Sequence, residues 1–244
     1  MTQALFNQHA DDYDNHAQIQ RQIASALIKQ LPININPDNI LELGAGTAFI
    51  SQKLSKEYFN AEITICDPAP NMIKVAKRKF TNNSKVNFIC DKLPNSGQFD
   101  LIISSMAIQW VDDWSKWMSN VTKLLKPGGY LCVATPTSGT LDFLPKAFKS
   151  ADLPYAGLSY RSESDLKNSA SSFDIKRIFT QSFIEDFDSP LSFFRKLHKI
   201  GANVSHYPLS PIQFKRLLKE CEKYKREGIL AAIYEVTFLQ ARIS

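Results

Sequence analysis

Short apolar runs alternate with amphipathic segments between residues 39 and 134. The runs are five or six residues long and rich in β-branched side chains, so they predict β-strands. They span 39–43, 62–66, 86–90, 99–104 and 130–134. Apolar positions at helical spacing predict helices over 47–58, 70–80 and 113–125. This alternation is typical of βαβ units with a parallel sheet and right-handed crossovers.

The regular alternation is confined to the middle of the chain. Before it, the apolar residues of 16–31 share one helical face, and Pro32 and Pro37 follow that helix. After Pro136 we expect a loop-rich stretch to about Asp174, a strand over 176–187, helices over 192–200 and 212–225, and a last strand over 233–239. The pattern predicts an α/β fold: a doubly wound, mostly parallel seven-stranded sheet with a helical insertion between the last two strands.

Ligands of such sheets bind beyond the carboxyl ends of the strands. In this sequence those ends carry Gly44, Asp67, Asp91 and Ser104–Ser105. The stretch Gly44-Ala45-Gly46 lies between a strand and a helix, where glycines permit a sharp turn and the helix presents free N–H groups. Asp67 lies 21 residues after Gly46, near the spacing at which a carboxylate meets a ribose hydroxyl pair. Alone, the two glycines are equally compatible with a structural turn.

The wider sequence around these positions resembles the class I S-adenosylmethionine-dependent methyltransferases. Leu41–Ala48 (LELGAGTA) resembles their first motif, ELGxGTG. It differs from the motif of a nicotinamide enzyme, which would normally show a third glycine and a pyrophosphate cradle. Further matches follow in order: DPAPNM at 67–72, CD at 90–91, FDLI at 99–102 and LKPGG at 125–129. The resemblance covers about residues 39–135 and implies S-adenosylmethionine as methyl donor and S-adenosylhomocysteine as product.

The resemblance implies a set of donor-binding residues. They are Gln18, Gly44, Ala45, Gly46, Asp67, Pro68, Met72, Asp91, Lys92 and Ser105. Two departures from the pattern concern this set. Ala48 stands at the third glycine position, and Asp91-Lys92-Leu93-Pro94 is shorter than the usual D-x-E-x-L-P and lacks its second acid, which concerns the adenine contacts.

Three features resemble one family more narrowly, the malonyl-[acyl-carrier protein] O-methyltransferases of biotin synthesis. Phe6, Ala10, Tyr13-Asp14, Ala17 and Gln18 resemble the opening F-x-x-x-A-x-x-Y-D-x-x-A-x-x-Q, with Gln18 taken as its glutamine. Ser104–Trp110 (SSMAIQW) resembles S-N-x-A-[VIL]-Q-W, and Phe194–Asn203 (FRKLHKIGAN) resembles L-R-x-L-K-x-I-G-A.

That resemblance implies methylation of the free carboxylate of malonyl on an acyl-carrier protein, or of malonyl-CoA, early in pimeloyl synthesis. It suggests Tyr13, Gln109 and Trp110 as the reaction pocket, although ordinary packing accounts for each equally simply. It divides a single domain, 1–244, into a helical cap (about 1–36), a donor-binding core (about 37–136), a substrate and lid region (about 137–230) and a last strand (about 231–241).

Charge is concentrated in one segment of the chain. The net charge is +5, yet residues 195–226 hold nine Lys/Arg and two Asp/Glu, a local +7 that leaves −2 for the rest. An acidic carrier protein is the partner this favours, with Arg195, Lys196 and Lys199 as substrate or carrier contacts. A solvated helix face is the alternative interpretation of the same charges.

The same sequence features are compatible with other functions. A methyltransferase of a quinone, phenol or free acid shares the whole donor core, and so does a donor-binding protein without catalysis. A nucleic-acid methyltransferase is disfavoured because no N/D-P-P-[YF] motif follows the fourth strand, where Ser104–Ala107 stands instead.

Composition adds several expected absences. His9, His16, His198 and His206 lack metal-ligand spacing, so we expect no metal. The four cysteines form no CxxC pair and are expected to be reduced and structural. Reduced cysteines predict a cytoplasmic protein, and the polar N-terminus and short apolar runs predict neither a secretory signal nor a membrane span. We also expect a monomer without nucleic-acid partners.

Overall fold

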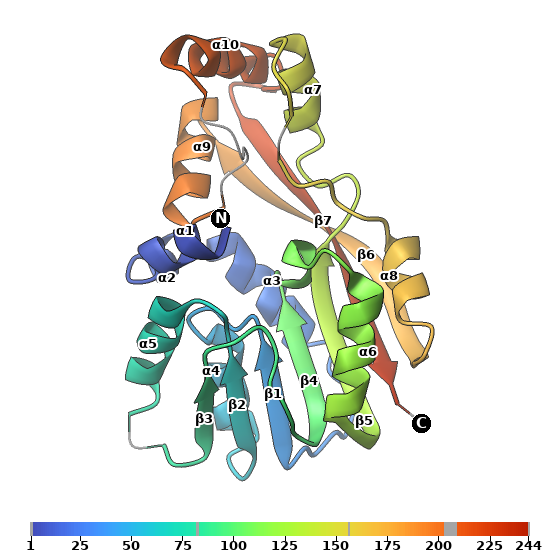
Figure 1. Ribbon diagram of the computed structural model, residues 1–244. Coiled ribbons are helices and arrows are strands. Elements are labelled where there is room, and N and C mark those ends of the chain that lie inside the picture. Colours follow the sequence, from blue (N-terminus) through green and yellow to red (C-terminus); the bar gives the residue numbers. More distant parts are fainter. Residues whose placement is uncertain (1, 82, 156, 203–208, 244) are drawn as a thin grey trace.

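A seven-stranded sheet forms the centre of the molecule, with the strand order β3-β2-β1-β4-β5-β7-β6 (Figure 1). The computed structural model describes residues 2–81, 83–155, 157–202 and 209–243. The strands are β1 (Asn39–Leu43), β2 (Glu62–Cys66), β3 (Val86–Ile89), β4 (Phe99–Ser105), β5 (Leu125–Pro136), β6 (Asp174–Phe187) and β7 (Leu230–Arg242). The first five pair in parallel, and β7 pairs antiparallel with both β5 and β6.

Helices cover both faces of this sheet, which makes it doubly wound. They are α1 (Thr2–His9), α2 (Tyr13–His16), α3 (Gln18–Ile28), α4 (Phe49–Glu57), α5 (Pro70–Lys79), α6 (Trp114–Leu124), α7 (Phe143–Ser150), α8 (Glu163–Ser169), α9 (Pro190–Lys199) and α10 (Pro211–Glu222), with a 3₁₀ turn at Ile108–Trp110. Because α9 and α10 lie between β6 and β7, the predicted fold class is confirmed, including the insertion.

The alternation of side chains along each strand divides the core into two layers. On β1, Ile40 packs with α3 and α4 in one cluster, while its neighbour Leu41 packs with α6 in the other. Successive side chains of a strand point to opposite faces, and both faces here are covered. This explains why these strands are apolar at nearly every position.

Two helices occupy a stretch that the sequence pattern predicts to be loop. Pro145 usually interrupts a helix, but here it stands in the first turn of α7, where the missing N–H costs no intrahelical hydrogen bond. The short helix α8 begins with a capping box, in which Ser162 and Asp165 bond each other's backbone N–H groups. The predicted helix over 16–31 is also shorter, since the backbone breaks at Ala17 between α2 and α3.

Helices α1 and α2 lie above α5, at the carboxyl-end side of β1 to β3, whereas α3 packs against β4, β5 and β6 (Figure 1). Polar contacts hold α1 and α2 there. Asn71 at the start of α5 donates from its backbone to Asn7 Oδ1 (2.7 Å) and from its side chain to the Asn7 carbonyl (2.9 Å). Asp14 accepts a hydrogen bond from Thr47 Oγ1 (2.6 Å) and pairs with Lys79 Nζ (2.6 Å). The cap is therefore tied to the turn and the helix that follow β1 and β2.

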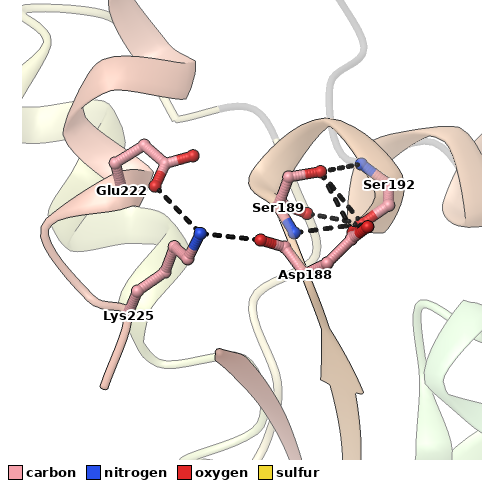
Figure 2. Close-up of polar contacts among 5 residues, drawn as sticks. All are labelled: Asp188, Ser189, Ser192, Glu222 and Lys225. Atoms are coloured by element: carbon pink, nitrogen blue, oxygen red, sulfur yellow. Dashed lines mark hydrogen bonds and ion pairs between the residues drawn. The ribbon is translucent and has the colours of Figure 1, made fainter. Parts of the chain in front are cut away.

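The insertion is anchored where β6 passes into α9, as Figure 2 shows. Ser189 caps α9 by accepting from the Ser192 backbone N–H (3.2 Å), and Ser192 Oγ donates to Asp188 Oδ1 (2.5 Å). Lys225, just beyond α10, donates to the Asp188 carbonyl (2.6 Å) and pairs with Glu222 (3.4 Å). These contacts fix α10 relative to the first turn of α9.

Candidate active site

The turn after β1 uses its two glycines for different purposes. Both have positive φ, +65° at Gly44 and +52° at Gly46, a region that favours glycine. A Cβ added to Gly44 would lie 2.3 Å from the Ala107 Cβ, whereas one added to Gly46 would meet nothing within 4 Å. Gly44 therefore lets two segments of the protein pack together, and Gly46 leaves open space above the backbone for a ligand.

The Asp67 carboxylate joins the turns that follow β1 and β2. It is 8% exposed, and its oxygens accept hydrogen bonds from the backbone N–H of Gly46 and of Ala69, both at 2.8 Å. Burial raises the pKa of Asp67, and the two N–H bonds act against that rise by stabilising the charged form. Each carboxylate oxygen retains a lone pair with which to accept from a hydroxyl.

Glu42, the acidic residue of the LELGAG stretch, is buried on β1 at 3% exposure. Its Oε2 accepts from the Ser51 backbone N–H (2.9 Å) and from the Ser51 hydroxyl. Burial raises the pKa of Glu42 to about 7, against the opposing effect of the Ser51 bonds. The group was part of the motif but was not predicted as a site residue.

A pH dependence of stability follows from Glu42. Between its ordinary value of 4.5 and about 7, the folded protein holds a proton that the unfolded chain has released. The Glu42 contribution to the free energy of unfolding is therefore present at low pH and falls as the pH rises through this window, by up to about 3 kcal/mol. We expect Glu42→Gln to flatten this part of a urea-denaturation pH profile, and the exposed control Glu62→Gln to leave it unchanged. Equal slopes in the wild type and Glu42→Gln would contradict the assignment.

The other residues predicted to contact the methyl donor differ in solvent exposure around the crevice between the turns after β1 and β2. Met72 is 2% exposed and packs with Ala10 and Ala69 beneath the cap, so it supports the site from below. Asp91 and Lys92 are exposed beyond β3, and Asp91 Oδ1 accepts from the Lys92 backbone N–H (2.6 Å). Pro68 accepts from Cys90 Sγ at 3.9 Å. Their contacts with a donor stay predictions.

A largely apolar pocket opens beside the crevice and gathers the three residues predicted to shape the reaction. Tyr13 from the cap meets Gln109 and Trp110 from the turn after β4. The Phe6 ring packs edge-on against both aromatics, with centroids 6.5 Å from Tyr13 and 5.7 Å from Trp110. Trp110 is half-buried in the pocket wall rather than enclosed in the core.

The structure directs a different glutamine into this pocket from the one predicted. Gln18 is exposed; it donates to the Asn15 carbonyl (2.6 Å) and accepts from Lys196 Nζ (2.9 Å). Gln20 lines the pocket instead. The spacing A-x-x-Q counted from Ala17 leads to Gln20, so the motif itself held the signal that the choice of Gln18 missed.

Two residues of the pocket lining, and two residues next to lining residues in the sequence, have buried polar atoms without a hydrogen bond. Within the part of the chain that the structure describes, Gln20 Oε1, Gln109 Oε1, Ser105 Oγ and Thr135 Oγ1 have no partner. Gln109 is already fixed at its other end, because its Nε2 donates to the Met106 carbonyl (2.7 Å). Unsatisfied buried groups cost about 1–3 kcal/mol each, so their concentration beside the crevice fits a polar ligand.

The predicted carrier contacts lie on α9 and separate into two kinds. Arg195 and Lys199 are exposed. Lys196 is mostly buried; it forms an ion pair with Glu185 and donates to Gln18, so its charge is already balanced within the fold. None of the three lines the pocket among the described residues.

The motif at 194–203 has a structural explanation as well. Leu197, Ile200 and Ala202 line the pocket. Gly201 has φ +75°, and a Cβ there would lie 2.8 Å from the Phe6 backbone N, so this glycine lets α1 approach the end of α9. Asn203, the last residue of the motif, and His206 lie outside the described residues.

Sequence reasoning missed three tyrosines of the same pocket: Tyr155 and Tyr160, which follow α7, and Tyr234 on β7. The region around the first two is predicted to be loop, where an aromatic residue has no periodic pattern to place it. Tyr234 belongs to a strand whose inward face is set only by pairing with β5 and β6. Two tyrosines so close together in a loop-rich stretch were the available signal.

The cysteines are placed for structural roles and form no cluster with other metal-ligating side chains in the described residues. All four cysteines are free, and Cys66, Cys132 and Cys221 are buried. Cys90 is exposed because β3 ends at Ile89, which corrects the expectation that it lies inside a strand. In residues 2–81, 83–155, 157–202 and 209–243, no three metal-ligating side chains gather. No described helix is long and apolar enough to span a bilayer.

Comparison with known proteins identifies the class to which this fold and site belong. A family model described as a methyltransferase domain matches residues 15–181. In solved structures, the fold resembles that of geranyl diphosphate C-methyltransferase from Streptomyces coelicolor in complex with S-adenosyl-L-homocysteine (TM-score 0.57, 10% identity, covering 91% of this chain and 75% of that one). Fold, glycine turn and carboxylate together define a class I S-adenosylmethionine-dependent methyltransferase.

Curated relatives narrow the class. A malonyl-[acyl-carrier protein] O-methyltransferase of Priestia megaterium is 31% identical over 247 residues, covering 91% of this chain and 89% of the relative. Malonyl-[acyl-carrier protein] O-methyltransferase 1 of Ilyobacter polytropus is 30% identical over 203 residues, covering 81% and 76%. The chain belongs to the family of malonyl-[acyl-carrier protein] O-methyltransferases.

Proposed function

We propose that this protein transfers the methyl group of S-adenosylmethionine to the free carboxylate of a malonyl thioester carried on an acyl-carrier protein. The observation that carries the proposal is the pocket beside the donor crevice, where Tyr13, Gln109 and Trp110 meet. The relatives at 30–31% identity, named for this reaction, support the choice of acceptor.

The donor would be held at the carboxyl ends of β1, β2 and β4. The open space at Gly46 would admit the amino-acid end, and the Asp67 carboxylate would accept hydrogen bonds from the ribose hydroxyls. Ser105, whose buried Oγ has no partner among the described residues, is the last residue of β4 at the same edge of the sheet. When bound, S-adenosylmethionine supplies an electrophilic methyl group on its sulfonium.

The acceptor needs little chemical activation. A malonyl carboxylate is already ionised at pH 7, so no general base has to remove a proton. The remaining tasks are to align the carboxylate oxygen with the methyl group and to exclude water, and alignment of this kind reaches effective molarities of about 10⁵ M or more. The apolar walls of the pocket, with Leu144, Leu197 and Ile200, suit the exclusion of water.

The test is incubation with labelled S-adenosylmethionine and malonyl-carrier protein, with malonyl-CoA and free malonate alongside. Label in the malonyl thioesters supports the proposal. Label only in a free acid, or in a quinone or phenol, would instead favour a small-molecule methyltransferase with the same donor core. Donor binding without transfer to any acceptor would indicate a binding protein.

Carrier docking through α9 gives a charge-dependent prediction. Arg195 and Lys199 are exposed, so the double variant Arg195→Glu/Lys199→Glu removes attraction for an acidic carrier without breaking the Lys196–Glu185 pair. We expect kcat/KM for malonyl-carrier protein to fall about tenfold at low salt and less at high salt, with malonyl-CoA unaffected.

Exposed lysines elsewhere provide the control for this experiment. Lys116→Glu/Lys123→Glu on α6 makes the same change in net charge and should leave carrier kinetics near the wild-type values. Equal effects of the two double variants, or no salt dependence in the wild type, would contradict docking at α9.

We further propose that the protein acts as a cytoplasmic monomer without a nucleic-acid partner, and that the cap, core, lid region and last strand form one folding unit. Contacts of the cap with α5, and of α9 with β6, support a single unit. Size-exclusion chromatography with light scattering tests the monomeric state, and a single unfolding transition tests the single folding unit.

A further inference from the structure

The acceptor pocket has an unusual lining for an enzyme whose substrate is an anion. Among its described lining residues, none is a lysine, arginine or histidine. The cations of α9 do not supply the missing charge, because they stand outside this lining. A carboxylate entering the pocket must therefore be met by neutral hydrogen-bond donors.

Two tyrosines outside the cap meet this need. Tyr160 and Tyr234 both line the pocket, and within the described chain neither hydroxyl has a hydrogen-bond partner. The nearby Tyr155 is different, because its hydroxyl donates to the Leu158 carbonyl (3.2 Å). Gln109 Oε1 is an acceptor and offers a carboxylate oxygen no proton, and Gln109 Nε2 already donates to the Met106 carbonyl (2.7 Å).

We infer that the hydroxyls of Tyr160 and Tyr234 hold the malonyl carboxylate and make the enzyme specific for a charged acyl group. The inference rests on the proposed function and adds to it the recognition of the acceptor. Hydrogen bonds to an ionised group are about twice as strong as neutral ones, so two phenols are enough to select for the anion. They leave the carboxylate charge unneutralised and its remaining lone pairs available to attack the methyl group.

The surroundings keep both phenols in the donating form. Burial raises the pKa of Tyr160 and of Tyr234 above the ordinary value, and the nearby Tyr160 raises the pKa of Tyr234 further. Glu185 also lies near Tyr234, but Lys196 forms an ion pair with it. The lysine charge offsets the repulsion between Glu185 and an incoming carboxylate.

The segment that carries Tyr160 is held in place from two directions. Ser138, which follows β5, donates from Oγ to the Tyr160 carbonyl (3.2 Å) and from its backbone to the Arg161 carbonyl (2.9 Å). The Arg161 guanidinium donates to the Asp112 carbonyl and lies over the Trp114 ring at 5.0 Å. Tyr160 is therefore positioned against the turn that carries Gln109 and Trp110.

The same arrangement explains release of the product. Transfer of the methyl group to one carboxylate oxygen converts the carboxylate into a neutral methyl ester, whose oxygens accept weaker hydrogen bonds from the two phenols. The pocket should therefore bind malonyl-CoA more tightly than either acetyl-CoA, which lacks the carboxylate, or the methyl ester product.

The test uses Tyr160→Phe and Tyr234→Phe, which remove only the hydroxyl, with malonyl-CoA as acceptor so that carrier docking plays no part. We expect KM for malonyl-CoA to rise about 10- to 100-fold, kcat to change less, and the preference for malonyl-CoA over acetyl-CoA in competitive binding to decrease. Affinity for S-adenosylhomocysteine stays at the wild-type value and shows that each variant is folded.

The control is Tyr130→Phe, in the middle of β5, where the Tyr130 ring lies 5.4 Å from the Arg242 guanidinium. It should leave KM unchanged. A KM within twofold of wild type in both pocket variants, or an undiminished preference for malonyl-CoA, would overturn the inference while methyl transfer by the wild type leaves the proposed function intact. A wild type that transfers no methyl group to malonyl-CoA or malonyl-carrier protein would overturn both.

Discussion

Replacement of Gly44 by alanine is expected to lower the free energy of unfolding by about 2–4 kcal/mol. The added methyl group would lie 2.3 Å from the Ala107 Cβ, and the backbone φ of +65° is unfavourable for any residue with a Cβ. The turn after β1 and the segment after β4 must separate to relieve the contact. Urea denaturation monitored by circular dichroism measures the loss.

Gly46→Ala is the matched control, because it shares the positive φ without the clash. Only the conformational strain of about 1–2 kcal/mol applies, so the variant stays more stable than Gly44→Ala. Its methyl group projects into the open space assigned to the donor, and calorimetry should show weaker binding of S-adenosylhomocysteine. Equal stability of the two variants would contradict the different uses of these glycines.

Asp67→Asn is expected to reduce the affinity for S-adenosylhomocysteine about 100-fold. The carboxylate accepts from Gly46 and Ala69 at the same time, and an amide has only one oxygen for these two N–H groups. The NH₂ group of the new asparagine would point at one of these backbone N–H groups, two hydrogen-bond donors facing each other. The ribose hydroxyls would also lose a charged acceptor. Isothermal titration of the purified variant measures the change.

Asp100→Asn is the control for Asp67→Asn at the opposite end of the sheet. Asp100 accepts from the backbone N–H groups of Asp38 (3.0 Å) and Asn39 (2.8 Å) and pairs with Lys126 (2.9 Å). The variant should lose stability but retain donor affinity. An Asp67→Asn protein that binds within threefold of the wild type would refute the role assigned to this carboxylate.

The parallel half of the fold was predictable because local and global preferences agree there. Strands β1 to β4 are short apolar runs bounded by turn residues, and their alternation with helices predicts parallel pairing. The start of β5 at Leu125, before the predicted 130–134, and the order of the strands were not predicted. Gly44, Gly46 and Asp67 were identifiable for the same reason, since the topology alone brings the carboxyl ends of β1 and β2 together.

The acceptor side was harder to predict because long-range packing determines it. Tyr234 reaches the pocket only through the antiparallel pairing of β7, and Tyr160 through the bonds of Ser138 and Arg161. Lys196 contributed to the basic pattern in the sequence, yet its ion pair with Glu185 depends on how α9 lies against β6. Spacing along the chain carries no signal for such contacts.

The most direct test of the account is the chemical identity of the methylated product. The wild-type protein is incubated with methyl-labelled S-adenosylmethionine and malonyl-carrier protein, and the product is treated with mild alkali. The account predicts that the label is released as methanol, because a carboxyl methyl ester hydrolyses under these conditions. Label that remains in a non-volatile product after alkali, as with an ether, an amine or a carbon-linked methyl group, would contradict methylation of the malonyl carboxylate.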